Sequence, residues 1–142
     1  MNDIRPRVLL AGTAEAIKKL RALLADEAQI VAAQSIDEAL RHIDPDIALI
    51  ICNVRFDDSR MFDFLHAVNA RLGVRCPPVI CCRLSQPPFS LGVRAAIRMA
   101  AQALGVSEFV DYYKLQEERG AEGAREKLRE IVMAHLPRVT GA

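Results

Sequence analysis

Residues Ile47 to Cys52 read IALIIC, an unbroken run without a polar side chain. A strand that is apolar at every position is covered on both faces, which is typical of the middle of a parallel sheet. The run begins after Asp44-Pro45-Asp46 and is far shorter than the ~20 residues that a membrane-spanning helix needs. The stretch therefore predicts a central, buried strand.

On both sides of this run, further short apolar runs alternate with longer stretches of helical periodicity. We expect the other strands over Val8–Ala11, Gln29–Ala33, Val79–Cys82 and Glu108–Tyr112. We expect helices over Ala14–Asp26, from the Ser35 capping box to Ile43, after the loop and N-cap residues Phe56–Ser59, over Ser90–Leu104 and over Ala121–Leu136. Strands that alternate with helices join through right-handed crossovers. The sequence thus predicts an α/β fold of the flavodoxin-like type, a doubly wound five-stranded parallel sheet in the order 2-1-3-4-5 with helices on both faces.

Length and composition exclude several classes of function. With 142 residues, of which 51% are hydrophobic and 26% charged, we expect one domain over 1–142, its core at about 7–136 and a flexible tail at 137–142. A net charge of +1 and an aromatic content of 5% argue against nucleic acid as a partner. The sequence shows neither a signal peptide nor a membrane span, so we expect a cytoplasmic protein with no membrane partner.

Several segments together carry a family likeness. They are RVLLAGTAEAIKKLRALL from Arg7, SIDEALRHIDPDIALIICNV from Ser35, FDFLHAV from Phe62, PPVICC from Pro77 and LGVSEFVDYY from Leu104. In order and local pattern the chain resembles the receiver domain of bacterial response regulators, over roughly Arg7 to Leu136. The resemblance implies a phosphoryl-accepting signalling domain. In that family two acidic residues after the first strand and an Asp ending the third hold Mg²⁺, and that Asp takes the phosphoryl group. A Thr or Ser ending the fourth strand and a Lys ending the fifth contact the phosphoryl group.

The chain departs from the family at each of these chemical positions. The acidic pair falls on Gly12 and Thr13, and the acceptor Asp falls on Asn53. The hydroxyl position falls on Arg83, or on Ser85 if the strand end bulges, and the Lys position falls on Tyr112, with Lys114 two residues beyond. Phe109 matches the aromatic residue that the family uses as a rotameric switch. We therefore predict a degenerate receiver, or pseudo-receiver, that is not an enzyme and has no metal or cofactor.

Other residues at the rim of the predicted pocket allow more than one interpretation. Arg83 either pairs with Asp57 or Asp58 of the neighbouring loop, or lies solvated at the strand end. Arg55 adds positive charge that would attract an anion. We interpret the cysteines as core residues of a protein in a reducing compartment, because they form no C-x-x-C motif and no His lies near them in sequence: Cys52, Cys76, Cys81 and Cys82.

The resemblance implies a stand-alone signalling module that acts by contact with an unidentified protein partner or with a second copy. The family signals and dimerises through its fourth helix, fifth strand and fifth helix, here about 90–136. Apolar residues spread around the fourth predicted helix instead of forming one stripe: Leu91, Val93, Ile97 and Met99. Two alternatives stay open. One is a receiver phosphorylated at an unusual acid such as Asp57 or Asp58, and the other is a small α/β ligand-binding protein or enzyme that uses the strand-end crevice.

Overall fold

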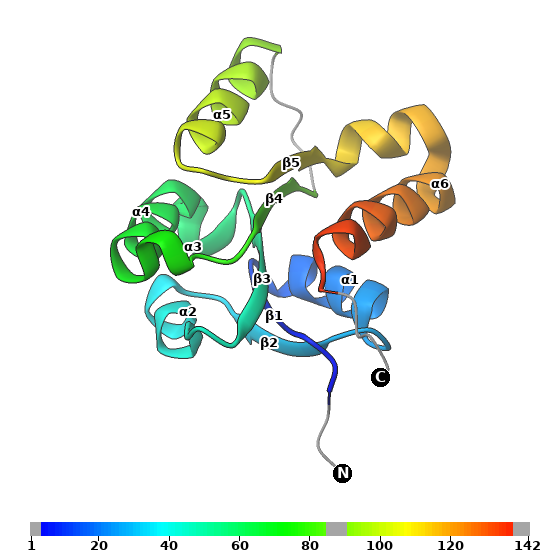
Figure 1. Cartoon of the computed structure of the whole chain (residues 1–142). Helices are drawn as coiled ribbons and strands as arrows, with labels where there is room; N and C mark the ends of the chain where they lie inside the picture. Colours follow the sequence, from blue (N-terminus) through cyan, green and yellow to red (C-terminus); the bar gives the residue numbers. More distant parts are fainter. Residues whose placement is uncertain (1–3, 85–90, 138–142) are drawn as a thin grey trace.

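The computed structural model describes residues 4–84 and 91–137. Five parallel strands form one sheet in the order β2-β1-β3-β4-β5, as predicted (Figure 1). The strands are β1 (Arg7–Ala11), β2 (Gln29–Ala33), β3 (Ile47–Asn53), β4 (Val79–Arg83) and β5 (Glu108–Asp111). Because all of them run in the same direction, their carboxyl ends meet at one edge, where ligands bind in folds of this class.

Helices cover both faces of the sheet (Figure 1). They are α1 (Ala14–Leu24), α2 (Ile36–His42), α3 (Phe56–Ser59), α4 (Met61–Leu72), the 3₁₀ helix η1 (Gly73–Arg75), α5 (Leu91–Ala103) and α6 (Tyr112–His135). The apolar residues of α1 and α6 pack against one face, and those of α2, α4 and α5 pack against the other. The molecule is therefore a three-layer α/β/α arrangement.

The apolar run that predicted the central strand lies at the middle of the sheet. β3 pairs with β1 on one side and with β4 on the other. Leu49 and Ile51 face the α1–α6 layer, whereas Ile50 and Cys52 face the α2–α4 layer, and all four are fully buried. Because successive side chains of a strand point to opposite faces, burial on both faces requires an apolar residue at each position.

Three of the four cysteines lie in this core. Cys52 and Cys81 are register partners on β3 and β4, and Cys82 faces the opposite layer. Burial raises the pKa of the Cys81 thiol to about 12, and burial, followed by the neighbouring thiols, raises the pKa of the Cys52 thiol well above its usual value. These thiols stay protonated at neutral pH, in agreement with the interpretation of them as packing residues.

Side-chain caps fix the start of the two helices that follow β1 and β2. Thr13 Oγ1 accepts a hydrogen bond from the backbone N–H of Ala16, and Ser35 Oγ accepts one from Glu38. The predicted capping box is shifted by one residue, since the Glu38 carboxylate accepts from the N–H of Gln34. Each cap satisfies a backbone donor that the first helical turn leaves without a partner.

The structure corrects predicted element boundaries near the carboxyl edge of the sheet, where β5 ends at Asp111 and not at Tyr112. The last helix begins at Tyr112 and not at Ala121, because the Asp111 carboxylate caps it, and Gly120 at φ +77° is a kink inside it. The N-cap of the third predicted helix does not come from Phe56–Ser59. That helix, α4, has Arg60 as its N-cap, because the backbone is left-handed from Asp57 through Ser59.

Within the described ranges, no helix has both the length and the apolar character needed to cross a membrane.

Candidate functional site at the carboxyl edge of the sheet

A buried ion pair joins the ends of β4 and β5. Arg83 and Asp111 are register partners, and Nη1 of Arg83 lies 2.9 Å from both carboxylate oxygens of Asp111. The two side chains are only 2% and 4% exposed, so water screens the pair very little. The edge of the sheet at these two strands is therefore held by a charge-assisted contact within the protein.

The same ion pair extends into α6. An oxygen of the Asp111 carboxylate accepts a hydrogen bond from the Lys114 N–H, 3.1 Å away, and so caps the helix. The guanidinium carbon of Arg83 lies 5.2 Å from the ring centroid of Tyr113, a cation–π distance. Through these contacts Arg83 ties the end of β4 to both the end of β5 and the first turn of α6.

This arrangement corrects the hypothesis that Arg83 pairs with Asp57 or Asp58 or lies solvated. Asp57 Oδ2 accepts a hydrogen bond from the Ile36 N–H at 2.9 Å and forms an ion pair with Arg60 at 3.7 Å. Asp58 is exposed. The left-handed turn that contains both aspartates places the Asp57 carboxylate at the start of α2.

The residues at the predicted metal and acceptor positions lie together at the ends of β1 and β3. A Cβ placed on Gly12 would lie 3.1 Å from the Cβ of Asn53 and 3.3 Å from that of Ala16. Asn53 is 3% exposed, and its amide oxygen accepts a hydrogen bond from the Arg55 N–H at 3.0 Å. Thr13 directs its hydroxyl at its own helix. Gly12 thus allows close packing against Asn53, a contact that a larger side chain would disturb.

The crevice between these residues is almost filled. Its volume is about 10 Å³, room for about one water molecule. Thr13, Ala16, Asn53 and Leu84 line it together with Glu15 and Lys19, which sequence reasoning did not single out. Lys19 Nζ lies 3.5 Å from the Glu15 carboxylate.

The residues of this crevice do not fit a Mg²⁺ ion held as in the receiver family. That ion needs several oxygen ligands in octahedral geometry and favours carboxylates. Gly12 supplies no side-chain oxygen, while the oxygens of Thr13 and Asn53 already accept hydrogen bonds from the backbone. Glu15 is the only carboxylate among the described residues that line the crevice, whereas the receiver family supplies three carboxylates to the ion.

The remaining predicted residues lie elsewhere. Tyr112 is the first residue of α6, one residue past the end of β5, and its ring packs against the α1–α6 layer. Lys114 is exposed, and its Nζ lies 3.7 Å from the Glu118 carboxylate on the same helix. Phe109 is half-buried on β5 and packs against the α2–α4–α5 layer. Ser85 lies outside the described residues.

Sequence reasoning missed the two partners of Arg83, namely Asp111 and Tyr113. A signal for the first was present: the predicted strand order makes the fourth and fifth strands neighbours, and each carries a charge of opposite sign near its end. The predicted fifth strand ended at Tyr112, one residue too late, so Asp111 was not recognised as the strand end opposite Arg83.

Comparison with known proteins finds similarity in structure only. No model of a protein family matches the sequence, and no curated protein matches it significantly. Solved structures do match. The non-phosphorylated receiver domain of HemR from Leptospira biflexa is 20% identical, with a TM-score of 0.65 over 94% of this chain and 98% of that one.

Two other receiver structures match to a similar degree. The chemotaxis protein CheY4 of Vibrio cholerae is 16% identical, with a TM-score of 0.66 over 93% of this chain and 99% of that chain. A response regulator receiver protein from Pseudoalteromonas atlantica is 16% identical, with a TM-score of 0.66 over 91% of this chain and 94% of that chain. At these identities the likeness establishes the fold, a CheY-like version of the flavodoxin-like sheet.

The buried ion pair leads to a prediction about stability. Arg83→Met should lower the free energy of unfolding by about 3–5 kcal/mol, because it leaves the Asp111 carboxylate buried without its cation. Arg83→Met combined with Asp111→Asn should cost clearly less than the sum of the two single changes, since no buried charge then remains and the amide oxygen still caps α6. Urea denaturation of the wild type, the two single variants and the double variant measures this coupling. Strictly additive effects would contradict a direct coupling of the two residues.

Proposed function

We propose that the chain is a pseudo-receiver of bacterial two-component signalling, which acts by protein–protein contact without aspartyl phosphorylation. The observation that carries this proposal is the buried Arg83–Asp111 pair at the edge of the sheet where a receiver places its phosphoryl-sensing residues. A phosphoryl group at that edge would supply a reversible anion for neighbouring donors. Here the carboxylate of Asp111 is a permanent anion, bound to Arg83 within the protein.

The ion pair favours a single conformation of this edge of the sheet over a switch between two conformations. Breaking the pair would leave two charges buried without their partners, which costs several kcal/mol. The helix cap at Lys114 and the Tyr113 ring would lose their contacts with the pair in the same step. The proposed module therefore keeps β4, β5 and the start of α6 in one arrangement, and its signal depends on which partner is present.

The neighbouring crevice supports the same proposal. Asn53 has no carboxylate to attack phosphorus, and its amide is engaged with the backbone of Arg55. The crevice of about 10 Å³ leaves little space for a phosphoryl group. This role also implies a cytoplasmic location, where two-component signalling takes place.

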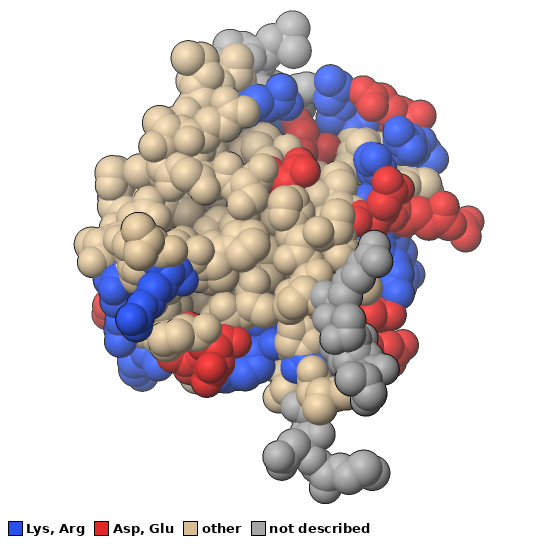
Figure 2. All heavy atoms as spheres, viewed as in Figure 1, with Lys and Arg blue, Asp and Glu red and all other residues tan. Residues whose placement is uncertain are grey.

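We further propose that a second copy of the chain binds at the α5–β5–α6 face, within about 90–136. Figure 2 shows that charged residues gather over α6, whereas the part of the same view over α5 has few of them. Met99 on α5 is 69% exposed, while Ile97 packs against the core. The other α5 side chains that are exposed are mostly small: Ala95, Ala96, Ala100 and Ala103. The side chains of Leu91 and Val93 lie outside the described residues.

Acetyl phosphate with Mg²⁺ tests the loss of phosphorylation. We expect no phosphoryl adduct by intact-mass analysis, neither on the wild-type chain nor on Asn53→Asp, because the restored carboxylate still lacks an acidic pair at Gly12 and Thr13. A functional receiver treated in the same tube controls for the reagent.

An adduct on the wild-type chain would overturn the pseudo-receiver proposal. If Asp57→Asn or Asp58→Asn then removed it, the alternative of an unusual phosphoacceptor would replace that proposal.

Self-association has its own test. Light scattering at high micromolar concentration should show a dimer for the wild-type chain and a monomer for Met99→Glu, because a buried, unpaired carboxylate disfavours an apolar interface. Val74→Glu is the matched control, since Val74 on η1 is another exposed apolar residue but lies outside 90–136. A monomeric wild-type chain, or equal loss of the dimer in the two variants, would contradict the proposed interface.

A further inference from the structure

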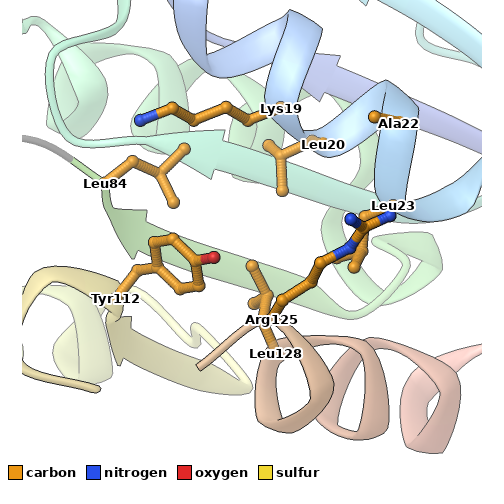
Figure 3. A pocket seen from close by; sticks show the side chains of 8 residues that line it. All are labelled: Lys19, Leu20, Ala22, Leu23, Leu84, Tyr112, Arg125 and Leu128. Atoms are coloured by element: carbon orange, nitrogen blue, oxygen red, sulfur yellow. The ribbon is translucent and has the colours of Figure 1, made fainter. Parts of the chain in front are cut away.

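A second hollow lies between α1 and α6 and uses none of the residues at the phosphorylation positions of the family except Tyr112. Its volume is about 230 Å³, far more than that of the filled crevice. Figure 3 shows side chains from both helices, from Leu84 after β4 and from Tyr112 around the opening. Most of its lining is apolar: Leu20, Ala22, Leu23, Leu84, Tyr112 and Leu128.

The walls of this cavity are held in place by other contacts. Leu20, Leu84 and Leu128 are buried members of the core on this side of the sheet. At one end of the helix pair, Arg129 of α6 donates a hydrogen bond to the carbonyl of Leu23 at 3.1 Å and pairs with Glu27. The cavity is thus preformed, which lowers the cost of ordering it around a ligand.

Two cations line the cavity from opposite sides. Lys19 comes from α1 and Arg125 from α6, and both are exposed. Figure 3 shows the Lys19 ammonium toward Leu84 and the Arg125 guanidinium beside Leu23, at opposite ends of the opening. Among the residues that the structure describes, no carboxylate lies within ion-pair distance of Arg125, and Lys19 has only its weak, exposed contact with Glu15. An apolar hollow flanked by two cations matches a ligand with an apolar body and an acid group.

We propose that the α1–α6 cavity binds a small amphipathic carboxylate, with its hydrocarbon body between Leu20, Leu84 and Leu128 and its acid group at the guanidinium of Arg125, where the positive charge of Lys19 adds a weaker, more distant attraction. The size of the cavity argues for a compact ligand, because sites for drug-sized molecules have about 300–1,000 Å³. It is too small to receive the face of a helix from a partner protein, for which a much larger surface is required.

The cavity adjoins the edge that the Arg83–Asp111 pair holds. Lys19 and Leu84 line both the cavity and the filled crevice, and Tyr112 follows Asp111 directly in sequence. A ligand here would contact the first turn of α6 and so reach one end of the proposed dimer face. The inference does not rest on the absence of phosphorylation, so the acetyl phosphate result leaves it unaffected.

Titration calorimetry with straight-chain carboxylates tests the proposal on the whole protein. Octanoate should bind, acetate should not, and affinity should rise about fourfold for each added methylene until the cavity is full. Octylammonium, with the same body and opposite charge, should bind at least tenfold more weakly than octanoate. Methyl NMR should locate the ligand through shifts at Leu20, Leu84 and Leu128.

Variants at exposed positions test the apolar cavity and the two cations separately, without disturbing the core. Ala22→Trp should abolish octanoate binding by filling the opening, whereas Arg21→Trp, on the same helix outside the cavity, should leave it unchanged. Lys19→Glu combined with Arg125→Glu should weaken binding about tenfold, and the control Lys18→Glu should not.

Three outcomes would overturn the proposal: no binding of octanoate, binding that persists in Ala22→Trp, or equal binding of octylammonium. If Ala22→Trp instead converted a wild-type dimer into a monomer, the cavity would belong to an interface between copies, and the ligand proposal would fail as well. The proposed α5–β5–α6 dimer predicts that Ala22→Trp stays dimeric, so the two proposals can fail separately.

Discussion

The ion pair between Arg83 and Asp111 joins three elements of this molecule, namely the end of β4, the end of β5 and the first turn of α6. Desolvating two charges is unfavourable, and their attraction offsets that cost only when the geometry is good and other hydrogen bonds complete it. The geometry of the contact is close, because Nη1 lies 2.9 Å from each carboxylate oxygen. On the carboxylate side a further hydrogen bond completes it, because Asp111 also accepts from the Lys114 N–H and so caps α6. Once formed, the pair disfavours any state in which β4 and β5 separate at this edge.

The neighbouring features agree with this constraint. Gly12 lets the end of β1 approach Asn53, and the space left between them is about 10 Å³. The hollow of about 230 Å³ lies instead between α1 and α6, which cover one face of the sheet. In the account that we propose, the residues that would accept and sense a phosphoryl group have been replaced by internal packing, while the surfaces beside them stay available to partners.

Much of the fold could be predicted from the sequence, because its signals are local. The unbroken apolarity of Ile47–Cys52 requires a strand buried on both faces, and alternation of strands with amphipathic helices restricts the topology to few solutions. Gly105, at φ +81°, lies just beyond the end of α5 at Ala103, and a glycine at this place is a local signal that ends a helix. Element order, sheet order and the core residues all follow from such patterns.

The site was harder to predict, because it depends on register. Whether the last strand ends at Asp111 or Tyr112 decides which side chain faces Arg83, and apolar patterning leaves an uncertainty of one residue. The left-handed turn from Asp57 to Ser59 contains no glycine, the residue that usually indicates such a turn in a sequence. The position of the Asp57 side chain therefore could not be predicted. The long-range partner of a buried charge becomes visible only when the strands are aligned side by side.

If the Arg83–Asp111 pair holds this edge of the sheet in one conformation, relaxation-dispersion NMR will show it. The backbone amides of Val110, Asp111 and Lys114 report on the end of β5 and the first turn of α6, on the microsecond-to-millisecond scale of conformational switching. The account predicts flat dispersion profiles at these amides in the wild-type chain and the appearance of exchange in Arg83→Met. Exchange in the wild-type chain that is unchanged by Arg83→Met would contradict it.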